Sequence, residues 1–511
     1  MSIDKIIISN RSALQTKYGS TGFQKIQSTV KQLIAADKKR KINGLLVFID
    51  DPKAMKKAKG KMVKDPTDAE QCKNAVDSLF HHYTPDYIML LGAQDILPHC
   101  RFRIPIPDDD DNFVPSDVPY ACDAPFSRNA GDFIAPGRVL GRLPDITGGT
   151  DPSYLVTLLQ NSINWKPLKL SAYKNYFSIS VKWWQKSTKI SLNNIFQNNS
   201  KLKLSPPTLG PYSKPDLGAM MHFFNCHGGL RTSEFYGQPN ENSSSFPVCL
   251  ESNMLEKKIS YGTVAAAECC YGGLLYNPNR PTKIHLPISN TYLQNNAVSF
   301  VGSTTAAYGP ADSQGGADYI TQYFLIAIQK GASCGRAFLE AQQRFVEKGD
   351  VKMDPTDLKT IIQFLLLGDP SVTPVESDPK TTPGKTPVKA IMNKDAHDIK
   401  ERKERRWKLA EKSVFINGTT DAPVRIEAPE RGSVKSDIKK ELRKYKFKDG
   451  KKMVYGFKKR KGKAKRLTTE HEYRYHVYSN VKKGGIIDTL RLLVIQEVNN
   501  KVMEVKEYVR R

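Results

Sequence analysis

Long apolar runs are missing from this sequence. No stretch approaches the roughly 18 consecutive apolar residues that a membrane-spanning helix needs. The first ten residues, Met-Ser-Ile-Asp-Lys-Ile-Ile-Ile-Ser-Asn, contain an aspartate and only three apolar residues in a row. We therefore expect neither a membrane segment nor a secretory signal peptide.

Cysteine is scarce as well, with eight residues in 511. The eight are scattered, and several lie inside apolar runs, where cysteine acts as a small hydrophobic residue. This usage fits a reducing compartment better than an oxidising one, so we expect a cytoplasmic protein. The residues are Cys72, Cys100, Cys122, Cys226, Cys249, Cys269, Cys270 and Cys334.

Two neighbouring pairs, Cys226 with His227 and Cys269 with Cys270, raise the question of a four-ligand zinc site. Adjacent residues of a strand point to opposite faces, and the usual Cys-x₂₋₄-Cys ligand spacing is absent. We therefore predict no metal and no cofactor.

Acidic residues are few relative to basic ones, with 52 Asp and Glu against 78 Lys and Arg and a formal net charge of +26. The excess is concentrated in residues 391–511, which hold 34 basic and 17 acidic residues. Such a region could bind nucleic acid or an acidic protein partner. It could equally be a solvated β surface whose aromatic residues face the core. The interleaved aromatic residues are Tyr445, Phe447, Tyr455, Phe457, Tyr473 and Tyr475.

The order of the predicted elements indicates an α/β fold. Residues 44–49 are a continuous apolar run typical of a buried strand, residues 65–83 read as a helix with Pro66 at its first position, and residues 87–91 read as the next strand. Strand, helix and strand in this order favour parallel pairing. A helical pattern over residues 152–165 then links two predicted subdomains, 1–165 and 166–375.

The pattern changes beyond residue 375. Residues 376–389 hold prolines, threonines and charges without apolar periodicity, and we predict a charged linker over 376–412. Apolar residues then recur with period two, which predicts a small basic β-rich domain over 413–511 that ends in a hairpin at Asn499-Asn500.

Two short stretches carry the candidate chemistry. Residues 221–229 read Met-His-Phe-Phe-Asn-Cys-His-Gly-Gly, and residues 263–273 read Thr-Val-Ala-Ala-Ala-Glu-Cys-Cys-Tyr-Gly-Gly. In each, an apolar run of strand length stops at a reactive side chain and then a glycine, as expected at the carboxyl edge of a parallel sheet. His227 and Cys270 are the candidates, because a thiol needs a nearby imidazole to deprotonate it. The N–H groups of Gly228 and Cys270 are the predicted oxyanion donors.

At these motifs the sequence resembles the caspase, legumain and gingipain clan of cysteine peptidases. Members carry a strand ending in His-Gly and a strand ending in Glu/Gln-Ala-Cys-x-Gly or a near variant. Further blocks follow in the order of the gingipain-like group, and the similarity covers roughly residues 40 to 375. These blocks are PDYIMLLG at 85–92, PSDVPY at 115–120, GRVLGRLP at 137–144, FVGSTTAAY at 300–308 and LGDPS at 367–371.

The resemblance implies a caspase-like α/β/α sandwich with mostly parallel sheets. It places Glu268 on the acidic or amide position of the motif, and therefore Cys270, not Cys269, at the nucleophile. Asp145 stands near where the gingipain-like pattern carries an acidic residue that can reach the histidine, although a surface aspartate opening a loop is the other interpretation.

The substrate pocket is expected beside the catalytic pair, because side chains two positions before His227 and Cys270 lie on the same face of an extended strand. Glu268 would favour a basic P1 residue if its carboxylate faced the pocket, or it could be tied up in a structural hydrogen bond. The predicted substrate-binding residues are Asn225, Glu268, Ser303 and Tyr308.

The sequence thus predicts a cysteine endopeptidase, intracellular and regulatory, that acts on a protein or peptide substrate through an acyl-enzyme. The alternative is a catalytically idle caspase-like scaffold that binds nucleic acid or a protein through its basic tail. Retention of both His227 and Cys270 favours the enzyme. We expect the tail to regulate or place the peptidase without joining its chemistry.

Overall fold

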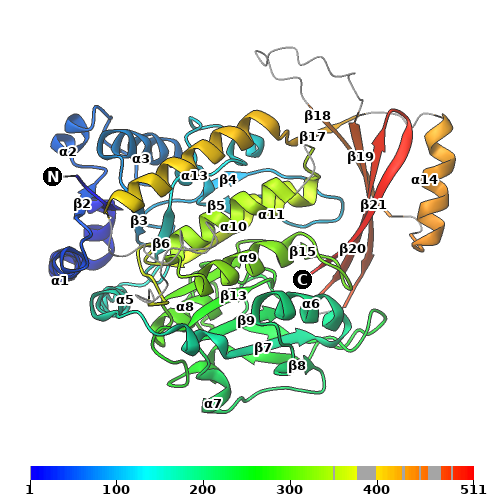
Figure 1. Ribbon diagram of the computed structural model, residues 1–511, viewed down its shortest axis with the longest axis horizontal. Coiled ribbons are helices and arrows are strands. Elements are labelled where there is room, and N and C mark those ends of the chain that lie inside the picture. Colours follow the sequence, from blue (N-terminus) through cyan, green and yellow to red (C-terminus); the bar gives the residue numbers. More distant parts are fainter. Residues whose placement is uncertain are drawn as a thin grey trace, which may run out of the picture.

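The computed structural model describes residues 2–348, 352–376, 399–427, 432–447, 450–457, 473–484 and 487–511. Its centre is a ten-stranded sheet covered by helices (Figure 1). All neighbouring strands are parallel except β14 and β16. Across the sheet the order is β2 (Gly44–Phe48), β1 (Lys5–Ser9), β3 (Tyr87–Leu91), β6 (Leu140–Leu143), β16 (Phe364–Gly368), β14 (Ser299–Ser303), β13 (Val264–Ala267), β9 (Met221–Asn225), β7 (Tyr176–Val181) and β8 (Leu202–Ser205).

The predicted α/β fold with mostly parallel strands is confirmed, and one continuous sheet runs through both predicted subdomains. Helices α1 (Arg11–Lys39), α5 (Ser153–Asn164) and α8 (Ile288–Gln294) pack in a row on one face. On the other face α6 (Gln185–Phe196), α9 (Ala317–Gln329) and α10 (Cys334–Lys348) do the same. No helix within the described ranges is both long and apolar enough to cross a membrane.

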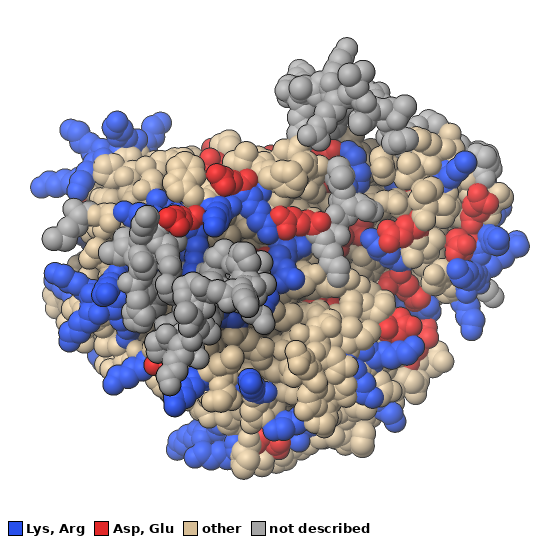
Figure 2. Space-filling model, in the orientation of Figure 1, with Lys and Arg blue, Asp and Glu red and all other residues tan. Residues whose placement is uncertain are grey.

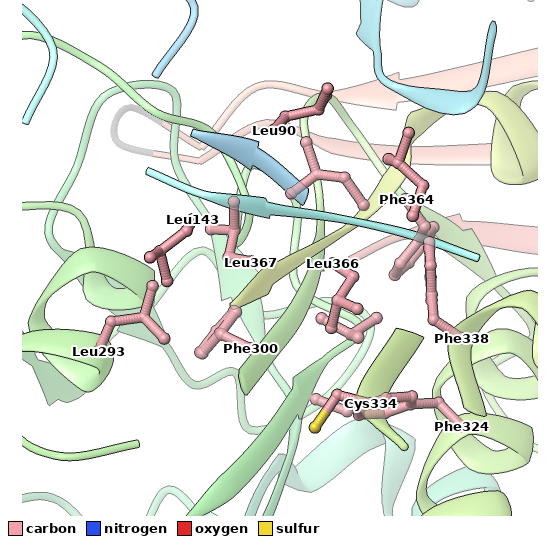
Figure 3. Close-up of a cluster of buried hydrophobic side chains, with 14 of the residues drawn as sticks. Leu90, Leu143, Leu293, Phe300, Phe324, Cys334, Phe338, Phe364, Leu366 and Leu367 are labelled. Carbon is pink, nitrogen blue, oxygen red and sulfur yellow. The ribbon is translucent and has the colours of Figure 1, made fainter. Parts of the chain in front are cut away.

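The strands are continuous apolar runs because helices bury them on both faces. Leu365, Leu366 and Leu367 of β16 are at most 3% exposed. Figure 3 shows Leu366 and Leu367 in one cluster with Phe300 of β14 and with side chains of α9 and α10. This core fixes the strand ends that carry the candidate site.

A second, antiparallel sheet of six strands lies beside the first and is formed mostly by the C-terminal residues (Figure 1). The predicted final hairpin is present, with Asn499 and Asn500 at φ 50° and 63°, the left-handed conformation that a tight hairpin turn needs. The sheet order is β15 (Tyr308–Gly309), β21 (Lys501–Arg510), β20 (Thr489–Val498), β19 (Tyr473–Lys482), β18 (Lys452–Phe457) and β17 (Pro423–Ile426).

The edge strand β15 of this sheet comes from the catalytic part of the chain, directly after the loop that follows β14. The C-terminal strands are therefore joined to that part by strand pairing as well as by the chain. Helix α14 (Gly432–Lys444) packs on the β20 and β21 side of the sheet through Val434 and Ile438.

The predicted charged linker has two parts. Residues 377–398 lie outside the described residues, whereas 399–412 belong to helix α13 (Ile399–Thr419), which packs along α10. Arg402 of α13 is fully buried, with its guanidinium 3.4 Å from the Asp86 carboxylate and donating to the Lys41 carbonyl at 2.8 Å. This helix is docked on the N-terminal subdomain.

The aromatic residues of the tail are largely part of its core. Tyr455 and Tyr475 are each 2% exposed and Phe447 is 6% exposed, so these rings are not available to stack on bases. Residues 458–472, which hold much of the basic segment, lie outside the described residues. On the face shown in Figure 2, Lys and Arg lie in separate groups, with Asp and Glu among them toward the C-terminal sheet.

Candidate functional site

The segments that carry His227 and Cys270 leave the sheet side by side. Strands β9 and β13 are parallel neighbours, with Phe224 opposite Ala267 in the register. A Cβ added to Gly228 would lie 1.9 Å from the carbonyl oxygen of Cys270, so the two backbones are in direct contact and only glycine fits there. The structure thus brings the predicted histidine and cysteine motifs together.

The two adjacent cysteines face opposite ways. Cys269 Sγ accepts a hydrogen bond from the Cys226 N–H at 3.4 Å, within the core of the main sheet. Cys270 Sγ accepts one from the Ala307 N–H at 3.2 Å and lies in a hydrophobic cluster with the C-terminal sheet. Of the two cysteines, Cys269 therefore belongs to the core of the main sheet, and Cys270 contacts the C-terminal sheet.

Burial controls the protonation of Cys270. The thiol is 1% exposed, and this burial raises its pKa to about 11, although the Arg510 guanidinium and the Ala307 N–H both act to lower it. A thiol with such a pKa is protonated at neutral pH. In this arrangement Cys270 is covered and is not yet a thiolate.

One ring nitrogen of His227 is hydrogen-bonded, and the other has no hydrogen-bond partner among the described residues. Its Nε2 lies 2.8 Å from Oε1 of Gln238, whose own Nε2 donates to the Ser243 carbonyl at 3.1 Å. This orientation makes Gln238 the acceptor, so the imidazole carries its proton on Nε2. Nδ1 is buried and has no hydrogen-bond partner among the described residues, which leaves its lone pair available to accept a proton.

The surroundings keep His227 neutral. The residue is fully buried, and its ring centroid lies 4.4 Å from that of Trp184 and 5.2 Å from that of Phe246. This burial lowers the pKa of the imidazole to about 3, although Gln238 acts to raise it. Sequence reasoning missed Gln238, since it belongs to a loop with no recognisable motif.

Asp145, the predicted partner of His227, is engaged elsewhere. Its carboxylate accepts from the Ala93 N–H at 2.6 Å, from Lys17 Nζ at 2.8 Å and from the Tyr18 hydroxyl. No hydrogen bond joins Asp145 to His227 within the described residues. The contacts of Asp145 stabilise the strand edge around β3 and β6.

Three of the predicted substrate-binding residues hold the frame of the site. Asn225 donates to Thr188 Oγ1 at 3.0 Å, and Ser303 Oγ lies 3.0 Å from the carbonyl oxygens of both Cys269 and Thr305. The Tyr308 hydroxyl donates to the Asp109 carboxylate at 2.8 Å. All three predicted residues are buried.

Glu268 lies at the floor of the site. It accepts from Thr321 Oγ1 at 3.0 Å. Burial raises its pKa well above the usual range, and the neighbouring Asp318 carboxylate raises it further. A glutamate in this position is held as the neutral acid next to the Asp318 carboxylate.

The side chain of Arg511 is buried beside these residues, and we call the residues that surround it the Arg511 pocket. The guanidinium Nη2 lies 3.0 Å from Oδ1 of Asp318 and donates to the Pro310 carbonyl at 2.7 Å, and the group stacks 4.6 Å over the Trp184 ring. Ser187 Oγ, 2.8 Å from Asp318 Oδ1, completes the wall. The pocket is thus built to hold a buried cation against a carboxylate.

The pocket residues come from the starts of helices at the carboxyl edge of the sheet. Trp184 ends the short turn Lys182–Trp184 after β7, Ser187 lies in the first turn of α6, and Asp318 lies in the first turn of α9. The sequence signals were Trp183-Trp184 directly after a strand and Gly315-Gly316 before Asp318. Nothing in the sequence connects these two signals.

Comparisons with known proteins agree with this geometry. The model of peptidase family C25 matches residues 2–375. The structure is similar to that of "the Arg specific cysteine proteinase gingipain R (RGPB)", with 10% sequence identity, a TM-score of 0.51 and coverage of 99% of this chain and 97% of that one. No curated protein sequence matches the chain.

Two more solved structures are similar over part or all of the chain. One, titled "Structure of Protease", has 11% identity and a TM-score of 0.46 over 99% of this chain and 96% of that one. The other is the Saccharomyces cerevisiae separase–securin complex, with 13% identity and a TM-score of 0.29 over 47% of this chain and 14% of that one.

Proposed function

Because this chain belongs to peptidase family C25, we propose that it is a cysteine endopeptidase with Cys270 as nucleophile and His227 as the proton-transfer group. The observation that carries the proposal is the contact between Gly228 and Cys270 at the ends of two neighbouring parallel strands. It sets the imidazole and the thiol on one edge of the sheet.

The proposed reaction uses the free nitrogen of His227. Nδ1 takes the proton of Cys270 as the sulfur attacks the peptide carbonyl, and then delivers it to the leaving amine. The N–H groups of Gly228 and Cys270 hold the oxyanion of the tetrahedral intermediate. Water then hydrolyses the thioester, with the imidazole again accepting a proton. Gln238 keeps the imidazole in the required tautomer.

The pocket supports a preference for arginine at P1. Gingipain R is described as Arg specific, and this chain has its own buried site for a guanidinium at Asp318. Arginine suits the pocket because its planar group both stacks on Trp184 and hydrogen-bonds to the carboxylate. The carboxylate that selects the P1 side chain in this proposal is Asp318, with Glu268 behind it.

The test is labelling with an arginyl chloromethyl ketone, followed by mass spectrometry of the modified peptide. The proposal expects the label on Cys270 and a much lower yield with an acidic P1 group. A label on Cys269, or no label on Cys270 in either the full chain or its Arg511→Ala variant, contradicts it. The alternative of an idle scaffold with a nucleic-acid-binding tail has less support, since Tyr455 and Tyr475 are buried.

A further inference from the structure

The end of β21 lies across the candidate site. Strand β21 pairs antiparallel with β15, with Arg510 opposite Tyr308 and Val509 opposite Gly309. One residue further, the Arg511 N–H donates to the Ala307 carbonyl at 2.9 Å. The N–H of the same Ala307 donates to Cys270 Sγ. The backbone of Arg511 is therefore one residue away from the thiol, in the extended form that a bound peptide adopts when it adds a strand to a sheet.

We infer that β21 is a built-in pseudosubstrate, which occupies the peptide-binding edge β15 and places Arg511 in the P1 pocket until the C-terminal sheet moves away. This inference rests on the proposed function, because it names the regulation of the same site. In this inference, a substrate pairs with strand β15. The C-terminal domain inhibits the enzyme by occupying that strand.

Burial of the catalytic pair supports the inference. His227 and Cys270 are 0% and 1% exposed, so neither side chain is accessible to solvent in this arrangement. Cys270 shares its hydrophobic cluster with Tyr475, Leu492 and Tyr508 of the C-terminal sheet. Ile487 of the same domain packs with Phe246, the residue whose ring borders His227. The cover is thus the C-terminal domain itself.

Only part of the hydrogen-bonding capacity of the Arg511 guanidinium is satisfied. It is 1% exposed and paired with Asp318, yet its Nε and Nη1 have no hydrogen-bond partner among the described residues. Buried donors without partners cost free energy. This cost lowers the free energy needed to move Arg511 out of the pocket, so a small guanidinium or amidinium compound can compete with it.

Part of the contact between the C-terminal sheet and the rest of the chain is short or partly exposed to solvent. Pairing of β21 with β15 involves two residue pairs only. A cavity of about 580 Å³ separates Glu504 and Lys506 of β21 from the loop around Ser313 and Gln314. Partly exposed ion pairs hold the C-terminal sheet at other points, such as Lys451 with Asp108 and Arg491 with Glu241, both at 2.6 Å. Such pairs weaken as salt screens them.

The experiment measures the rate at which iodoacetamide alkylates Cys270 in the full chain, with the site located by mass spectrometry. We expect Arg511→Ala to raise this rate about tenfold or more, because loss of one partner of a buried ion pair releases the strand. Lys501→Ala, which removes an exposed cation at the far end of the same strand, should leave the rate unchanged. Equal rates in wild type and Arg511→Ala would overturn the inference.

A second measurement uses the unaltered protein. Benzamidine, which mimics an arginine side chain, should displace Arg511 and accelerate alkylation of Cys270 in wild type but not in Arg511→Ala. Slower or unchanged alkylation in wild type would overturn the inference even where the variant does not fold. Alkylation requires no peptidase activity, so the two claims can fail separately. If Cys270 becomes accessible as expected but the protein cleaves no arginyl peptide, the proposed function is refuted, whereas the conclusion that β21 and Arg511 cover Cys270 is retained.

Discussion

The ring of Trp184 lies against the imidazole of His227, with 4.4 Å between the ring centroids. The Arg511 guanidinium lies over the same indole at 4.6 Å. One indole therefore contacts both the Arg511 guanidinium and the His227 imidazole. In the proposed function, this sharing links occupation of the proposed P1 pocket to the packing of the proposed proton-transfer group.

The assignment of the nucleophile predicts different outcomes for the two cysteines. Cys270→Ala should abolish hydrolysis of an arginyl peptide, whereas Cys269→Ala should retain most of it, since Cys269 Sγ only accepts a hydrogen bond in the core. Loss of that bond should cost about 1 kcal/mol of stability. Steady-state kinetics and thermal unfolding measure both effects. Activity in Cys270→Ala would show that the register of the motif is wrong.

Gly228 is expected to tolerate no side chain. In Gly228→Ala the new Cβ would meet backbone atoms of Cys270, which cannot rotate away, so the strand ends must separate. We expect loss of activity and destabilisation by about 1–3 kcal/mol. Gly418→Ala is the matched control, because a Cβ there would meet no described atom within 4 Å and the position lies in helix α13. Equal stability of the two variants would refute the close approach.

Much of this fold could be predicted from the sequence. The predicted strand at Tyr87–Leu91 is buried on both faces and is a continuous apolar run in the sequence, and His227 and Cys270 stand where such runs end. The hairpin at Asn499-Asn500 follows from a local turn preference. These features depend on residues close together in the chain.

The rest depends on contacts between distant segments, which no local pattern encodes. The pair formed by Asp318 and Arg511 joins residues 193 positions apart, and Gln238 meets His227 through a loop without a motif. Glu268 was a candidate for the P1 carboxylate because it shares a face with Cys270, but burial next to Asp318 keeps it neutral. Asp145 directly follows the GRVLGRLP block at 137–144, but its carboxylate binds Lys17 and the Ala93 N–H instead of His227.

Asp318 should set the preference for arginine at P1. Asp318→Asn keeps the shape of the side chain but removes the charge that faces the guanidinium, so kcat/KM for arginyl peptides should fall about 100-fold. Peptides with an uncharged P1 residue should lose much less. Asp312→Asn serves as control, because Asp312 is exposed and lies in the loop that precedes α9. An unchanged ratio between the two substrate types would assign the pocket elsewhere.

Gln238 should act as a positioning residue for His227. Gln238→Ala removes the acceptor that fixes the imidazole, so kcat should fall while KM changes little. In Gln238→Glu a carboxylate faces Nε2–H and raises the pKa of the imidazole. Because the base works in its neutral form, activity is lost as the pH falls through this pKa. The acid limb of the pH–rate profile should therefore move to higher pH in Gln238→Glu. A profile identical to that of wild type would rule out the role.

The protonation of Cys270 should report the opening of the C-terminal sheet. Burial is the main cause that raises the pKa of this thiol to about 11, so contact with water should bring it down toward the ordinary value of about 8.5. Loss of the nearby Arg510 charge on opening would act in the other direction, but it is the smaller of the two effects.

Iodoacetamide reacts with the thiolate, so the alkylation rate rises with pH until the thiol is fully ionised. Wild type should reach half of its maximal rate near pH 11, and Arg511→Ala at a distinctly lower pH. Lys501→Ala should follow wild type, since its exposed side chain lies away from the site. Rates fitted across the pH range, with the label located on Cys270, give the three midpoints. A common midpoint for all three proteins would mean that removing the Arg511 side chain does not uncover the thiol.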